Sequence, residues 1–145
     1  MSCSKWWTIL AVPVVVLLAV FVIPVAADDV DRWIQDLKDP IVVVRVAAAV
    51  ALYELNDTRA VEPLIQVLND EDERVRLYAV MALSDIGDTR AVGPLIQVLN
   101  DDRPDVSSKA AEALFKFNDT RAVEPLIQAL EDGNWDDVRM YIVRS

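Results

Sequence analysis

The sequence predicts an all-α fold: an α-solenoid, or α-α superhelix, of about four two-helix repeats, preceded by a hydrophobic N-terminal segment. Three observations predict it. Residues 57–70 recur almost unchanged at 88–101 and 119–132, a period of 31 residues. Each copy has helical apolar spacing, and turn residues separate the helices. A fixed period of this length is typical of a repeat array whose neighbouring units share one core.

The first 27 residues differ in composition from the rest of the chain. Lys5 precedes 22 residues without a charge, 6–27, and Asp28 ends the run. Two interpretations are compatible with this pattern. A cleaved secretory signal is favoured because Pro24 and Ala26-Ala27 suit a peptidase site. A retained anchor is the alternative, since about 20 apolar residues span a bilayer. In both cases we expect residues 28–145 to form a repeat domain outside the cytoplasm.

The repeat domain divides into four units on the 31-residue period: 29–56, 57–87, 88–118 and 119–145. In unit two, the first helix has apolar residues at i, i+3, i+4 and i+7, counted from Val61. The second helix has one apolar stripe from Val75 to Ile86, in which Ala79 and Ala82 allow close helix packing. Units one and three repeat this stripe.

Turn residues fall at the expected helix ends. Asp57, Asp88 and Asp119 are good N-cap residues, and Asn56, Gly87 and Asn118 suit left-handed C-caps. Pro63 lies too deep for a helix that begins at Thr58, so we expect a short turn over 57–61 and then a helix with proline at its first position. A single kinked helix is the alternative. Unit one has Arg32 in this place and is expected to form one continuous helix.

Composition excludes several classes of site. The net charge is −10, so the surface repels the phosphates of nucleic acids. With no histidine and only Cys3, the chain cannot form a Ser-His or Cys-His pair, a zinc site of nitrogen and sulfur ligands or an internal disulfide. The acidic stretches 69–73 and 131–137 lack the spacing of a calcium loop. We therefore expect no catalytic residue, metal or cofactor, and no nucleic-acid partner.

The stretch Asp-Thr-Arg-Ala-Val-Glu-Pro-Leu-Ile-Gln-Val-Leu-Asn-Asp-Glu-Asp-Glu-Arg-Val-Arg at 57–76, followed by Ala-x-x-Ala-Leu, resembles the HEAT-like repeat named after the phycobilisome lyases. The resemblance covers about residues 29–143. It implies an armadillo- and HEAT-like superhelix whose second helices line a concave face. Metal-dependent hydroxylases of this class bind iron through His-Glu motifs, which this chain lacks. Bilin lyase activity belongs to longer relatives, so neither activity transfers by fold alone.

The resemblance also implies a structural ladder of aspartates and arginines between repeats. The candidates are Asp39 with Arg45 and Asp70 with Arg76, which are six residues apart across the turn between the two helices. In unit three the equivalent of the arginine is Ser107, opposite Asp101. The ladder is therefore expected to weaken toward the C-terminus.

The candidate binding surface is the second-helix face. We define it as the positions of the second helices that lie outside the apolar stripes and are expected to point away from the core. The copies agree in framework and differ here, as on the variable surface of a constant scaffold. Its candidate residues are Val43, Val46, Val50, Glu73, Arg74, Leu77, Tyr78, Met81, Lys109 and Glu112. We call Val43, Val46, Val50, Leu77, Tyr78 and Met81 the apolar patch and expect a protein or peptide to anchor there. Alternatively, the valines of unit one pack on the leader or on the first helix.

The C-terminal end is a second candidate for association. In unit four, Trp135, Met140, Tyr141 and Ile142 are expected to leave an incompletely covered apolar end, which either closes the array or pairs with another chain. The sequence as a whole predicts a non-enzymatic interaction scaffold that is exported or membrane-anchored. The alternatives are an accessory or lyase-like subunit of an enzyme or chromophore system, and a structural module of an envelope assembly.

Overall fold

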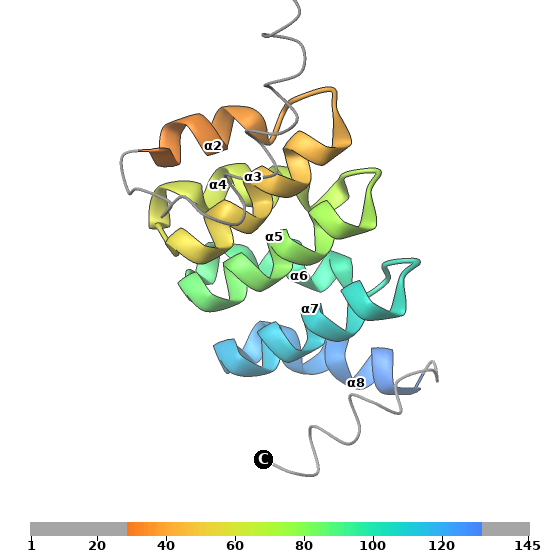
Figure 1. The fold of residues 1–145 in the computed structure, drawn as a ribbon. Coiled ribbons are helices and arrows are strands. Elements are labelled where there is room, and N and C mark those ends of the chain that lie inside the picture. Colours follow the sequence, from red (N-terminus) through yellow and green to blue (C-terminus); the bar gives the residue numbers. More distant parts are fainter. Residues whose placement is uncertain (1–28, 132–145) are drawn as a thin grey trace, which may run out of the picture.

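The computed structural model describes residues 29–131. The predictions for the leader, for the second helix of unit four and for Trp135, Met140, Tyr141 and Ile142 lie outside this range. Within it the fold is all-helical, as predicted, with seven α-helices packed side by side (Figure 1). None of the helices between residues 29 and 131 has both the length and the hydropathy that a membrane-spanning helix needs.

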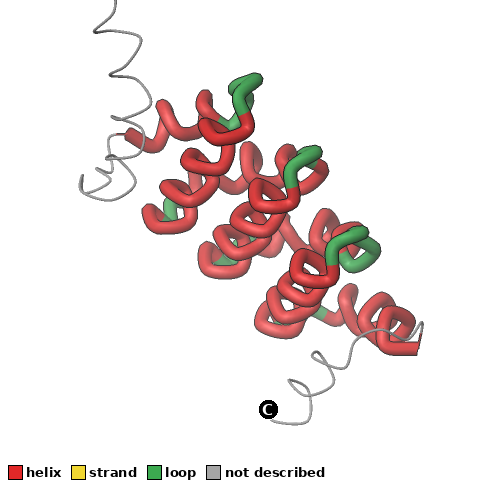
Figure 2. The backbone as a smooth tube through the Cα atoms, turned by 45° about the vertical axis from the view of Figure 1, so that its right-hand side comes forward, coloured by secondary structure: helices red, strands yellow, loops and turns green. Residues whose placement is uncertain are grey.

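The helices form two layers. The first helices are α2 (Val30–Asp36), α4 (Val61–Gln66), α6 (Val92–Val98) and α8 (Val123–Glu131). The second helices are α3 (Val42–Leu55), α5 (Glu73–Ile86) and α7 (Pro104–Phe117). In the second layer α5 packs between α3 and α7. The loops that join the first and second helices of units one to three lie along one edge of the array (Figure 2).

The first helices of units two to four each begin with a 3₁₀ turn: Thr58–Ala60, Thr89–Ala91 and Thr120–Ala122. The preceding aspartate caps each turn through its side chain, which accepts a hydrogen bond from the main-chain N–H two residues on. The side-chain hydrogen bond from Arg121 lowers the pKa of Asp119 to about 2. The N-cap prediction is therefore confirmed, and each cap is anionic near neutral pH.

The predicted position of the prolines is wrong by two residues. The α-helix begins at Val61, which makes Pro63 its third residue, and Pro94 and Pro125 lie equivalently in α6 and α8. The 3₁₀ turn leads directly into the α-helix, and proline is tolerated here because N–H groups in the first turn have no intrahelical acceptor. The C-caps are as predicted: Asn56 and Asn118 (both φ 51°) and Gly87 (φ 72°) adopt the left-handed conformation.

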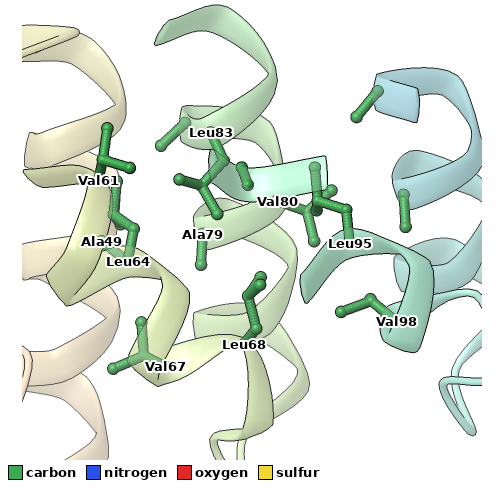
Figure 3. Close-up of a cluster of buried hydrophobic side chains, with 14 of the residues drawn as sticks. Ala49, Val61, Leu64, Val67, Leu68, Ala79, Val80, Leu83, Leu95 and Val98 are labelled. Carbon is green, nitrogen blue, oxygen red and sulfur yellow. The ribbon is translucent and has the colours of Figure 1, made fainter. Parts of the chain in front are cut away.

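The core lies between the two layers and runs through the units without interruption (Figure 3). Leu64 from α4, Leu83 from α5 and Leu95 from α6 are fully buried, and Ala79 lets α5 approach its neighbours. Burial falls in α8, the last helix of residues 29–131: Val61 and Val92 are fully buried, whereas Val123, at the equivalent position of α8, is 53% exposed. Each unit therefore depends on its neighbours to cover its apolar residues.

Exposed ion pairs join the first helices of neighbouring units. Arg59 reaches Asp31 of unit one at 3.7 Å, and Arg90 reaches Glu62 of unit two at 3.0 Å. Between units three and four, Gly93 occupies the position that Asp31 and Glu62 hold in the earlier units. The Arg121 side chain donates instead to the Thr89 carbonyl oxygen at 3.4 Å. The replacement of Glu62 by Gly93, which is the one difference between the first two copies of the repeated stretch, therefore removes a carboxylate from these inter-unit ion pairs.

Replacing Gly93 with glutamate is expected to stabilise the domain by about 1 kcal/mol, because glycine is a poor helix former and the new carboxylate favours the helix N-terminus and lies near Arg121. A Cβ at Gly93 meets no atom within 4 Å. Thermal unfolding should shift upward by roughly 4–8 °C. Gly93→Gln is the control, since it improves helix propensity without adding charge. An unchanged or lower midpoint for Gly93→Glu would contradict this account.

Candidate binding face

Two arginines in the second helices clamp neighbouring units together. Arg45 donates from Nε to Oδ2 of Asp70 at 2.8 Å and from Nη2 to Oδ1 at 3.0 Å, while its Nη1 donates to the main-chain oxygen of Asp39 at 3.0 Å. Arg76 repeats this arrangement with Asp101, at 2.7 and 2.9 Å, and with the main-chain oxygen of Asp70 at 2.8 Å. Each arginine therefore holds the turn of its own unit and the carboxylate of the next.

These ion pairs are largely shielded from water. The side chains of Arg76 and Asp101 are 10% and 8% exposed. Burial alone raises the pKa of Asp101, but hydrogen bonds from the Arg76 guanidinium and the Arg103 main-chain N–H outweigh it, so this pKa lies below its ordinary value. A bidentate pair of this geometry fixes the register of one unit on the next.

The spacing of six residues suggests that each arginine pairs with the aspartate of its own unit. In the structure each arginine pairs instead with the aspartate of the next unit. The Asp39 carboxylate accepts from the Ile41 main-chain N–H at 2.7 Å, and Arg45 donates to the main-chain oxygen of Asp39. Asp101 belongs to the ladder, as the partner of Arg76. The ladder stops at Ser107, whose hydroxyl donates to the main-chain oxygens of Arg103 and Pro104 instead. These residues act as framework.

On α3 and α5 the structure brings the apolar patch together on one face. Val43 is 57% exposed, and Val46 and Val50 are half-buried. Leu77, Tyr78 and Met81 are half-buried on the adjacent helix α5. The inner parts of Val46, Leu77 and Tyr78 pack against the core, so the patch is a fixed surface of the array. Glu73 and Arg74 lie exposed at the start of α5, paired with Arg103 and Asp72 respectively.

The face changes from apolar to charged along the array. On α7, Lys109 pairs with Glu112 at 2.6 Å, and Lys116 reaches back to Asp85 of α5 at 3.0 Å. A shallow hollow of about 150 Å³ is lined by side chains from α3, α5 and α7. Its lining residues are Tyr53, Met81, Ser84, Asp85, Lys109 and Glu112.

Tyr53 is absent from the residues predicted as candidates. Its ring lies 6.5 Å from the ring of Tyr78, at 49°, and extends the apolar patch toward the hollow. The sequence does hold a signal for it, because positions 53, 84 and 115 are equivalent in the repeat and carry Tyr, Ser and Phe. Variation at this position indicates surface rather than framework, as at the predicted positions.

The acidic turns of residues 29–131 are occupied by hydrogen bonds of their own. Oδ1 of Asp70 accepts from the Asp72 main-chain N–H at 2.9 Å, and Asp72 caps α5 through the Arg74 N–H at 3.0 Å. In this part of the chain no three carboxylate or cysteine side chains are grouped closely enough to hold a metal ion.

Comparison with known proteins gives the family of the chain. The family model for HEAT repeats matches residues 30–114 and 61–145, and so covers nearly the whole repeat region. A search of curated proteins finds no match. The matching model describes HEAT repeats in general, so the narrower phycobilisome-lyase type stays a prediction. With the stacked helix pairs and the 31-residue period, the match shows that this chain belongs to the HEAT-repeat family.

Proposed function

We propose that this chain is a non-enzymatic scaffold that binds a protein or peptide on its second-helix face. HEAT-repeat domains commonly serve as protein-interaction scaffolds. The observation that carries the proposal is the partly exposed apolar patch on α3 and α5, in which Val43 is exposed and the other five residues are half-buried above the core. Exposed apolar surface of this kind marks contact with another molecule, and tyrosine and methionine are favoured at such contacts.

Comparison of equivalent positions supports this proposal. Leu52, Leu83 and Leu114 are the same residue and are fully buried in all three units. On the second-helix face, by contrast, Val50 is followed by Met81 and Glu112, and Ala47 by Tyr78 and Lys109. The framework positions stay constant while the face changes from unit to unit.

We also propose that the repeat domain works outside the cytoplasm, with residues 1–27 as a cleaved signal or a membrane anchor. The uncharged run of 6–27 and the acidic residues that follow motivate this proposal. The mass of the purified mature chain separates cleavage from retention. Recovery of the uncleaved chain in the soluble cytoplasmic fraction would contradict both forms.

The function is tested by changing Val46 and Tyr78 to aspartate in the full chain, because a buried unpaired charge is strongly unfavourable in an apolar contact. Cells expressing the variant are crosslinked, and the adducts are compared with those of the unchanged chain. We expect the partner adduct to disappear while the helical circular dichroism signal is retained. Loss of the adduct together with the helical signal would show only unfolding.

A gentler variant and a matched control accompany this experiment. Val43→Asp changes a side chain that is already 57% exposed, so it should weaken capture without affecting folding. Gln97→Asp adds the same charge to an exposed position of α6, on the opposite layer, and should leave capture unchanged. If the adduct persists in the folded double variant and in Val43→Asp, the second-helix face is not the binding surface.

A further inference from the structure

The positive charges of the array are largely engaged with its own carboxylates. Every arginine in residues 29–131 forms an ion pair with an aspartate or glutamate of the same chain. On the second-helix face, Lys109 and Lys116 are paired as well. Since the full chain carries a net charge of −10, the charge that it presents to a partner is the excess of carboxylates.

The hollow on the second-helix face places two carboxylates beside an aromatic ring. Asp85 comes from α5, Glu112 from α7 and Tyr53 from α3, and all three line the hollow. A cation in this hollow can bond to a carboxylate and lie against the face of the tyrosine ring. The Ser84 hydroxyl, also in the lining, provides a further acceptor.

The lysines that pair with these carboxylates are held only weakly. In the Lys109–Glu112 and Lys116–Asp85 pairs all four side chains are at least 41% exposed. Exposed ion pairs contribute little, since water screens the attraction and ordering long side chains costs entropy. An incoming cation can therefore replace a lysine at small cost. An anionic ligand would have to remove the same lysines from their partners against the negative charge of the whole chain.

The hollow adjoins the apolar patch. Met81 belongs to both, and the Tyr53 ring in the hollow lies beside the Tyr78 ring in the patch. A single short segment can therefore place apolar side chains on α3 and α5 and one cationic side chain in the hollow. This arrangement separates an apolar contact, which supplies affinity, from a charged contact, which supplies selectivity.

We propose that the partner of the second-helix face is a basic amphipathic peptide segment, whose apolar side chains lie on the apolar patch and whose lysine or arginine enters the hollow beside Tyr53, Asp85 and Glu112. This inference rests on the proposed function and names the class of partner. It fixes the direction of the segment relative to the array: the apolar part lies toward unit one and the cation toward unit three.

The test is selection from a random twelve-residue peptide library displayed on phage, with the full chain as target. The selected peptides should combine leucine or aromatic residues with lysine or arginine, and their affinity should fall as ionic strength rises. The double variant Asp85→Asn, Glu112→Gln should weaken these peptides about tenfold or more. Asp105→Asn with Glu124→Gln removes the same charge outside the hollow and should change affinity by less than about twofold.

A double-mutant cycle separates contact in the hollow from general attraction. Replacing the peptide's cation with norleucine should cost about as much as the hollow variant does, and the two changes together should cost little more than either alone. Selected peptides that are acidic or uncharged, no selected peptides, or equal weakening by both double variants would overturn the inference. Uncharged peptides that lose binding on Val43→Asp would leave the proposed function intact while this inference fails.

Discussion

Replacing Arg76 with alanine should cost about 3 kcal/mol of folding stability, because it leaves the carboxylate of Asp101 buried without its partner. The side chain of Asp101 is only 8% exposed, and two of its hydrogen bonds come from Arg76. The substitution also removes the donor to the main-chain oxygen of Asp70, and with it the hold on the turn before α5. Urea unfolding followed by circular dichroism measures the loss.

Arg74 provides a matched control on the same helix. It pairs with Asp72 at 2.9 Å, but its side chain is 57% exposed. Arg74→Ala should therefore cost about 0–1 kcal/mol, as is usual for surface pairs. Equal losses from the two variants would show that the ladder is an ordinary surface feature.

The loss caused by Arg76→Ala should also depend on pH. The pKa of Asp101 is lowered in the folded protein, so its pairing stabilises the fold above the ordinary carboxyl pKa and is lost as the pH falls through the folded value. The difference between wild type and variant should therefore be largest near neutral pH and shrink under acid conditions. A difference independent of pH would show that the lost main-chain bonds dominate.

The features that sequence alone predicts well are local ones. The N-caps at Asp57, Asp88 and Asp119 and the left-handed residues Asn56, Gly87 and Asn118 follow from the conformational preferences of single residue types. The apolar stripes follow from helix geometry, and in units two and three their alanines and leucines are buried as expected. The position of Pro63 was predicted wrongly, because the preceding 3₁₀ turn shifts where the α-helix begins.

The features that local patterns miss depend on stacking between units. Arg45 takes its carboxylate partner from Asp70, 25 residues ahead, rather than from Asp39. Tyr53 of α3 lines the same hollow as residues of α7 only because α5 packs between these two helices. Such contacts can be predicted from the repeat period only once the register in which one unit packs on the next is known. The role of the side chains that face a partner is harder still to predict, because the residues of the framework do not determine which side chains stand at these positions.

Photo-crosslinking tests the central claim, that a partner contacts the layer of second helices, most directly. Benzoylphenylalanine is placed by amber suppression at one site in each of four proteins. Two sites, Val43 and Met81, lie on the second-helix face. The two control sites, Gln66 and Gln97, are exposed on the first helices α4 and α6. Each site tolerates a large side chain better than the core does, so the four proteins should fold alike.

Irradiation of cells that express each protein should give the same partner adduct from Val43 and Met81 and none from Gln66 and Gln97. The photoreactive group forms a bond only with atoms that it touches. The two pairs of sites are on helices of opposite layers of the array, so a partner on one layer is out of reach of the other pair (Figure 1). An adduct formed from Gln66 and Gln97 but absent from Val43 and Met81 would contradict the account and assign binding to the first helices.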